Sequence, residues 1–163
     1  MTVTYSSYLH LDELLAAQQP LSDGPEHDEM LFIVIHQVYE LWFKQLLHEA
    51  DYLGTALEQD DLPRVYATLK RFLTILKVQV AQIDILETMS PVSFLSFRAR
   101  LDTASGFQSP QFRELEFVLG RRSARMIAHH AGTPAADRLA AMLHEPSLWD
   151  HFVQFLVRHG YGV

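Results

Sequence analysis

The chain has 163 residues, enough for one domain and too few for two of ordinary size. Its net charge of −7 argues against nonspecific binding to nucleic acid, and the lack of cysteine excludes disulfides, thiolate metal sites and a cysteine nucleophile. The sequence shows no signal-peptide pattern and no apolar run long enough for a membrane span, so we expect a cytoplasmic protein with no membrane partner.

Apolar residues recur at helical spacing along most of the chain, and no segment alternates for long enough to predict a strand. A short helix is expected over residues 8–19, ended by Pro20. A long helix over about residues 26–58 carries apolar residues on two faces. It should therefore lie in the middle of the fold.

A second long helix should follow, because Asp60, Asp61 and Pro63 form a helix start signal. It has the most regular amphipathic pattern in the sequence. Its apolar positions are Leu62, Val65, Leu69, Phe72, Leu76, Val80, Ile83 and Leu86. The link between the two long helices is short, so they should pack nearly antiparallel.

Four shorter helices are expected over residues 91–98, 111–119, 134–143 and 147–158, with an exposed loop at residues 103–106. The predicted fold class is all-α, a helical bundle with long antiparallel central helices. We expect a single domain over residues 1–163. Within it, residues 1–24 form an N-terminal arm with a short helix, and residues 25–163 form the helical core.

One face of the first long helix carries Phe32, His36, Tyr39 and Phe43 at intervals of three or four residues. Such a stripe can be ordinary core with one hydrogen-bonded histidine. It can also line an apolar pocket in which a single polar side chain forms a hydrogen bond with an aromatic ligand. The spacing does not decide between the two interpretations.

Arg98 follows two phenylalanines in the segment Phe94-Leu-Ser-Phe97-Arg98. A lone arginine is usually a solvated surface charge. Beside a pocket, its planar guanidinium would instead bind a carboxylate through two parallel hydrogen bonds. Arg98 is therefore a candidate anion-binding residue.

The nine histidines do not form a recognisable metal motif. No paired Glu-x-x-His motif and no His-Glu-x-x-His motif occurs, and His129 and His130 are expected at the surface near a helix end. We assign no metal ligand, including among His144, His151 and His159. Phosphate-binding loops, nucleophile elbows and dinucleotide fingerprints are also absent from the sequence.

Several unusual stretches occur in a fixed order along nearly the whole chain. They are Tyr5–Asp12 (YSSYLHLD), His27–Lys44 (HDEMLFIVIHQVYELWFK), Phe97–Arg98, Ala104–Ser109 (ASGFQS), Gln111–Arg113 (QFR) and Glu116–Gly120 (EFVLG). Their order, spacing and residue choices resemble those of tryptophan 2,3-dioxygenases, and the match is to the N-terminal half of that family.

The resemblance implies a haem-dioxygenase-like fold and haem b as cofactor. Members of this family use O2 to cleave the indole C2–C3 bond of L-tryptophan, which gives N-formyl-L-kynurenine and starts the kynurenine pathway of tryptophan catabolism. The implied small-molecule partners are thus L-tryptophan and O2.

The resemblance also assigns roles by position. His36 matches the distal, catalytic histidine that hydrogen-bonds the indole N–H, and Arg98 matches the arginine that binds the substrate carboxylate. Phe32 matches the aromatic residue that packs on the indole beside the haem. The neighbouring positions implied to contact substrate are Ile33, Val34, Ile35 and Phe94. Ser105 and Gly106 match the loop beside the haem.

Tyr5 and Tyr8 match tyrosines of an N-terminal arm that reaches into the substrate pocket of a neighbouring subunit. The resemblance therefore implies a homotetramer in which subunits exchange arms.

Two departures from the family pattern matter. Phe94 stands where the family usually has a tyrosine whose hydroxyl helps to bind the carboxylate, so substrate binding should be weaker or the substrate altered. Family members also continue past the position matching Val163, and the proximal histidine that holds the iron lies in that further half.

Three alternatives follow from the second departure. The chain is a fragment of a longer enzyme, a half-length relative that needs a second chain for the proximal half, or a binding module for aromatic amino acids without catalysis. A related haem oxygenase acting on another aromatic substrate also remains open, because of Phe94.

Overall fold

The computed structural model describes residues 2–24, 26–102 and 104–163. These residues form helices and connecting turns and no strand, which confirms the all-α prediction. The α-helices are α1 (Tyr5–Leu9), α2 (Leu11–Ala16), α3 (Asp28–Glu58), α4 (Leu62–Leu86), α5 (Pro91–Arg98), α6 (Pro110–Val118), α7 (Ala124–Ile127), α8 (Pro134–Met142) and α9 (Leu148–Arg158). Short 3-10 turns lie at η1 (Ala99–Leu101), η2 (Gly106–Gln108) and η3 (Ala128–His130).

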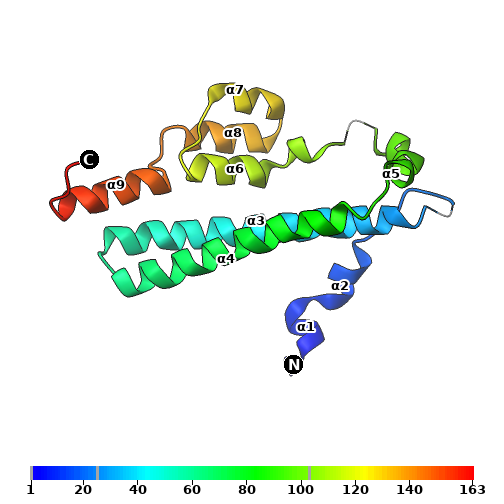
Figure 1. The fold of residues 1–163 in the computed structure, drawn as a ribbon, viewed down its shortest axis with the longest axis horizontal. Helices are drawn as coiled ribbons and strands as arrows, with labels where there is room; N and C mark the ends of the chain where they lie inside the picture. The colour runs from blue at the N-terminus through cyan, green and yellow to red at the C-terminus, as the bar shows by residue number, and fades with distance from the viewer. Residues whose placement is uncertain (1, 25, 103) are drawn as a thin grey trace. The chain divides into compact units, whose positions relative to one another are not determined.

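The chain, whose helices are drawn in Figure 1, divides into two compact units. The first unit lies within residues 1–38 and 82–103, and the second comprises residues 39–81 and 104–163. Both long helices contribute residues to both units. The expectation of a single domain stays a prediction.

The N-terminal segment differs from the predicted helix over residues 8–19. A capping box between Thr4 and Ser7 starts α1 at Tyr5, and His10 adopts a left-handed conformation with φ 50° that separates α1 from α2. Farther along, Gln37 on α3 donates a hydrogen bond of 3.0 Å to the carbonyl of Ala17. The arm therefore starts earlier and contains a break that apolar spacing does not reveal.

In the second unit, α3 and α4 run antiparallel, as the short link predicted. Leu57 near the end of α3 packs in one cluster with Val65 near the start of α4, whereas Leu46 packs with Phe72 and Ile75 farther along. The hydroxyl of Tyr39 donates a 2.6 Å hydrogen bond to the carbonyl of Gln79. Residues that are earlier in α3 thus contact residues that are later in α4, which is the antiparallel arrangement.

The buried face of α4 agrees only in part with the predicted stripe, of which Val65 and Phe72 are buried and Leu76 packs against the core. Its buried residues are Val65, Thr68, Phe72, Ile75 and Gln79. The predicted stripe residues Leu62, Leu69, Val80 and Ile83 are exposed. Thr68 and Gln79 are buried although they are polar, so the apolar pattern alone does not define the buried face.

Two further helices cover the second unit's core. Leu115 of α6 packs against Leu46 and Ala50, and Leu148 and Phe155 of α9 pack against the cluster around Leu53. A capping box between Ser147 and Asp150 fixes the start of α9.

Gly54 lies under α9. A Cβ atom at this position would come within 3.3 Å of His151 Cδ2, a distance that requires the imidazole to move. The same ring forms an ion-pair contact of 3.2 Å with Glu58. Gly54 therefore permits the close approach of α9 to α3.

No helix in the described residues is both long enough and apolar enough to cross a membrane.

Leu46→Ala should reduce the free energy of unfolding by about 2–5 kcal/mol, because Leu46 is 0% exposed within the α3–α4–α6 core and truncation leaves a cavity. Urea denaturation followed by circular dichroism measures the change. Leu41→Ala, at a position of the same helix that is 51% exposed, is the matched control and should change stability by less than about 0.5 kcal/mol. Equal effects of the two substitutions would contradict the assignment of the core.

Candidate functional site

An aromatic cluster in the first unit joins the start of α3 to α5. The ring centroids of Phe32, Phe94 and Phe97 are separated by 5.6–5.8 Å, within the range for favourable aromatic pairs. Phe97 is fully buried and anchors α5, whereas Phe32 and Phe94 are half-buried. The last two rings therefore keep part of their surface available to a ligand.

Local sequence explains why α5 carries these rings. Ser90 caps the helix by accepting a 3.0 Å hydrogen bond from the Ser93 N–H, and Pro91 occupies the first turn. Phe94 and Phe97 are three residues apart, so both lie on the same side of this short helix. The predicted helix over residues 91–98 is confirmed.

His36 lies one turn after Phe32 on α3, with the two ring centroids 4.1 Å apart. Its Nδ1 is 2.7 Å from the carbonyl oxygen of Phe32. A carbonyl only accepts hydrogen bonds, so Nδ1 is the donor. In the Nδ1–H tautomer the other ring nitrogen, Nε2, has a free lone pair, and within the described residues no group donates to it. His36 can thus accept a hydrogen bond from a ligand.

Arg98 is the last residue of α5 and is half-buried. Its Nη1 donates a 2.9 Å hydrogen bond to the carbonyl of Asp102, whose φ of 47° is rare for a residue other than glycine. No carboxylate pairs with Arg98 in the part of the chain that the structure describes. Its remaining N–H donors can therefore bind an anion.

The three apolar residues between Phe32 and His36 lie on different faces of α3. Ile35 is 4% exposed and belongs to the core, Ile33 is half-buried, and Val34 is exposed. Consecutive residues on a helix are rotated by about 100°, which accounts for the difference. Their predicted contact with substrate stays a prediction.

Glu29, which the sequence analysis missed, is buried in the first turn of α3, with 1% exposure. Its carboxylate accepts hydrogen bonds from the N–H groups of Leu21 (2.7 Å) and Ser22 (3.0 Å) and from the Ser22 hydroxyl. Burial raises the pKa of Glu29, but these hydrogen bonds and the charge of Arg100 outweigh it, so the pKa lies below its usual range. From the sequence, an acidic residue in the first turn of a helix indicates only a favourable interaction with the helix dipole. It does not predict the buried hydrogen bonds of Glu29 with Leu21 and Ser22.

Tyr5 and Tyr8 lie on α1 and are 78% and 74% exposed. No residue of α1 is buried. Both phenol rings are therefore available for contact with another molecule, as arm exchange requires.

Ser105 and Gly106, the predicted cofactor positions, belong to the second unit. The carbonyl of Ser105 accepts a 2.9 Å hydrogen bond from the Gln108 N–H, and its own N–H donates to Gln108 Oε1 at 3.1 Å. Both residues are exposed. The predicted loop over residues 103–106 thus leads into the turn η2, while Thr103 lies outside the described residues.

The histidines later in the chain differ from expectation in one case. His129 is exposed as predicted, but His130 is 4% exposed, so its predicted surface position is wrong. The sequence analysis missed α7 and η3, which fold His130 inward. Across residues 2–24, 26–102 and 104–163, no three histidine, aspartate or glutamate side chains are grouped to hold a metal ion.

Comparison with known proteins identifies the family. The family model described as tryptophan 2,3-dioxygenase matches residues 1–157. The chain is 56% identical to "Tryptophan 2,3-dioxygenase" of Herpetosiphon aurantiacus over 99% of its length, and 55% identical to the protein of that name from Anaeromyxobacter sp. over 99%. A third relative with this name, from Caulobacter vibrioides, is 47% identical over 99% of the chain. The chain belongs to the tryptophan 2,3-dioxygenase family.

The chain spans about three fifths of the length of these relatives, with coverage of 62% for the Herpetosiphon protein and 60% for the Anaeromyxobacter protein.

Glu29→Gln should release the segment before α3, because an amide cannot accept all the hydrogen bonds of the carboxylate. Hydrogen exchange should show at least roughly tenfold lower protection of the Leu21 and Ser22 amides, as expected for lost hydrogen bonds to a charged group. Glu87→Gln, at an exposed position of the same unit, should leave this protection unchanged.

The wild-type protection should also depend on pH. The pKa of Glu29 is lowered in the folded protein, so its stabilising contribution is complete above the unfolded pKa of about 4.3. That contribution is lost as the pH falls through the lower, folded-state pKa. Glu29→Gln should abolish this acid-dependent loss, and equal pH profiles for the variant and the wild type would contradict the role of Glu29.

Proposed function

We propose that this chain forms the substrate-binding part of a haem-dependent dioxygenase that cleaves the indole C2–C3 bond of L-tryptophan with O2 to give N-formyl-L-kynurenine. Family membership and the names of the relatives support this function. The observation within the site that carries it is the 2.7 Å contact between His36 Nδ1 and the Phe32 carbonyl, because it occupies Nδ1 and leaves Nε2 for the indole N–H.

The site contains complementary groups for each part of tryptophan. The half-buried faces of Phe32 and Phe94 suit the indole ring, and the free donors of Arg98 suit the carboxylate. Together, these contacts would hold the indole in one orientation. Such orientation lowers the entropic part of the barrier to reaction.

The residues present fit one face of haem b. The Phe32 ring offers an apolar surface, and His36 Nε2 beside it is a polar group suited to the distal side. On the family resemblance alone we also propose Ser105 and Gly106, which belong to the second unit, as cofactor contacts. Haem, when bound, supplies the oxygen chemistry, while the protein residues bind and orient the substrate and exclude water.

We assign no histidine of this chain as the iron ligand, and propose that it comes from a partner chain or from the part of the relatives outside the match. Homotetramer formation with arm exchange belongs to the same proposal. It is supported by the exposure of Tyr5 and Tyr8.

An absorbance titration of the chain with haemin, before and after L-tryptophan, tests the proposal. A sharp Soret band that shifts on addition of L-tryptophan is expected when the iron ligand is supplied, either by added imidazole or by the part of the relatives outside the match. Arg98→Lys should weaken the tryptophan effect and leave haem uptake unchanged, because lysine cannot form the bidentate contact. Tryptamine, which lacks the carboxylate, should shift the band equally in the wild type and Arg98→Lys. A chain that takes up haem but shows no response to L-tryptophan would overturn the assignment of the substrate, and a chain without stoichiometric haem uptake would be a substrate-binding module at most.

Phe94→Tyr should tighten L-tryptophan binding by about tenfold or more, because a phenol hydroxyl would donate to the charged carboxylate. Calorimetric titration measures the dissociation constant. Tryptamine binding should not improve, since the new hydrogen bond acts on the carboxylate. Phe94→Leu is the second control and should weaken both ligands through the lost ring contact. Unchanged or weaker L-tryptophan binding in Phe94→Tyr would contradict the placement of the carboxylate near position 94.

A further inference from the structure

Arg98, the candidate anion-binding residue, is oriented by the turn that follows it. Its Nη1 donates a 2.9 Å hydrogen bond to the carbonyl of Asp102. The turn η1 lies between the two residues, and Asp102 adopts φ 47° and ψ −121°, which is rare for a residue other than glycine. A backbone in such a conformation persists only where surrounding contacts hold it. The orientation of the Arg98 guanidinium therefore depends on what holds η1.

Arg100, in the middle of η1, supplies a contact of this kind. Its Nη1 lies 3.1 Å from Glu26 Oε1, an ion pair between residues that are 74 positions apart in the sequence. It also donates a 3.3 Å hydrogen bond to the carbonyl of Ser96. Among the described residues, no other ion pair involves α5 or η1. Arg100 thus ties the turn both to its own helix and to the segment that leads into α3.

Glu26 is suited to anchor this contact, because its carboxylate is largely enclosed. Its side chain is 15% exposed, and Oε2 is buried with no hydrogen-bond partner in the described ranges. A Cβ atom on Gly24 would come within 2.8 Å of this oxygen, so the lack of a side chain at position 24 leaves room for the carboxylate. An enclosed carboxylate is costly without a cationic partner. The pair with Arg100 provides that partner.

The same pair keeps the carboxylates at the start of α3 satisfied without Arg98. Glu26 is bound by Arg100, and Glu29 is bound by two backbone N–H groups. An arginine that paired with either carboxylate would have fewer donors for a ligand. The charge of Arg98 is therefore left for an anion from outside the chain.

We propose that Glu26 and Arg100 are positioning residues for substrate recognition. Their ion pair holds η1, and η1 holds the Arg98 guanidinium in the orientation that binds a carboxylate. This inference rests on the proposed function, in which Arg98 binds the carboxylate of L-tryptophan, and it adds two residues that the sequence analysis did not single out. A guanidinium that is already fixed binds a carboxylate more tightly than a mobile one, because less side-chain entropy is lost on binding.

The state of the Arg98 guanidinium can be measured without a ligand. In heteronuclear NMR spectra at low temperature, a guanidinium held by a hydrogen bond gives separate, slowly exchanging Nη–H signals, whereas a freely rotating one gives averaged signals. We expect separate signals for Arg98, identified by their loss in Arg98→Lys. Arg100→Gln and Glu26→Gln should average these signals. Arg100→Lys, which keeps the charge, should preserve them.

Binding of L-tryptophan to the haem-loaded chain, with the iron ligand supplied, is the second measurement. Tryptamine, which lacks the carboxylate, is the comparison ligand. Arg100→Gln and Glu26→Gln should each weaken L-tryptophan binding by about tenfold, as for a weakened hydrogen bond to a charged group, and leave tryptamine binding unchanged. The shared direction is diagnostic, because the two substitutions change the net charge in opposite senses. A direct electrostatic effect on the carboxylate would weaken binding in Arg100→Gln and strengthen it in Glu26→Gln.

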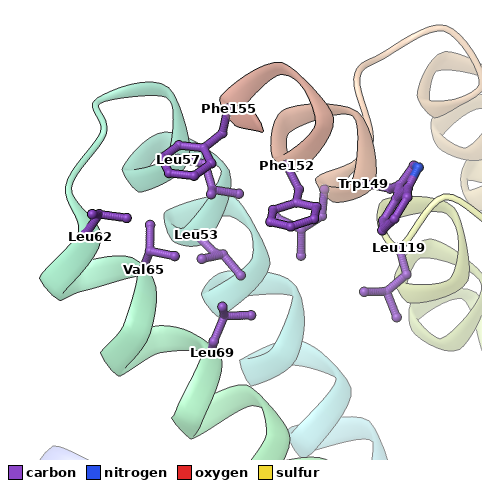
Figure 2. Close-up of a pocket in the computed structure, with 10 residues that line it drawn as sticks. Leu53, Leu57, Leu62, Val65, Leu69, Leu119, Trp149, Phe152 and Phe155 are labelled. Carbon is purple, nitrogen blue, oxygen red and sulfur yellow. The ribbon is translucent and has the colours of Figure 1, made fainter. Parts of the chain in front are cut away.

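Two variants serve as controls. Arg125→Gln removes the charge of an exposed arginine that forms no ion pair in the described ranges. Phe152→Leu removes ring surface from an apolar hollow of about 460 Å³ in the second unit, which side chains of α3, α4 and α9 line without a charged group (Figure 2). It therefore lowers stability without changing charge. Neither variant should alter the Arg98 signals or the relative binding of the two ligands.

Three results would overturn the proposal. They are Arg98 signals that are the same in the wild type, Arg100→Gln and Glu26→Gln, equal weakening of both ligands, and opposite effects of the two substitutions on L-tryptophan. A wild-type chain that does not bind L-tryptophan would contradict the proposed function instead. The NMR comparison would then still decide whether Glu26 and Arg100 hold Arg98.

Discussion

The chemistry available at the candidate site depends on one hydrogen bond, from His36 Nδ1 to the carbonyl of Phe32. The helix makes this contact possible, because residues four apart lie one turn from each other. Because Nδ1 donates to the backbone, Nε2 is the ring nitrogen left for a ligand, beside the Phe32 ring. The polarity of the site is therefore set by main-chain geometry rather than by a second polar side chain.

Sequence patterns predicted the helical class, the short α3–α4 link and the bounds of α5 because these follow from local signals such as Ser90-Pro91 and Asp60-Asp61. They failed where the result depends on contacts between distant residues. The apolar pattern of α4 predicted Leu69 and Ile83 in the stripe, but both are exposed and the polar residues Thr68 and Gln79 are buried. The left-handed His10 and the inward position of His130 likewise have no local signature.

In the candidate site, too, residue identities could be predicted from the sequence, whereas their contacts could not. His36, Phe32 and Arg98 could be singled out from residue types and family resemblance, but their atomic roles could not. The tautomer of His36 and the contact of Arg98 with Asp102 required coordinates. Glu29 escaped notice because its partners, Leu21 and Ser22, belong to a turn whose path the sequence does not specify. This buried carboxylate nevertheless holds Leu21 and Ser22 in place, in the segment that precedes α3 with Phe32 and His36.

The close approach of Gly54 to His151 couples the residues that positions 54 and 151 can accept. Alanine would favour the helix by about 1 kcal/mol over glycine, yet a Cβ there would lie 3.3 Å from His151 Cδ2, so the imidazole would have to move by a few tenths of an ångström. A smaller residue at position 151 would remove this conflict, whereas movement of the imidazole would alter its 3.2 Å contact with Glu58. Substitutions at positions 54 and 151 should therefore occur together among related proteins, because both residues determine how closely α9 packs on α3.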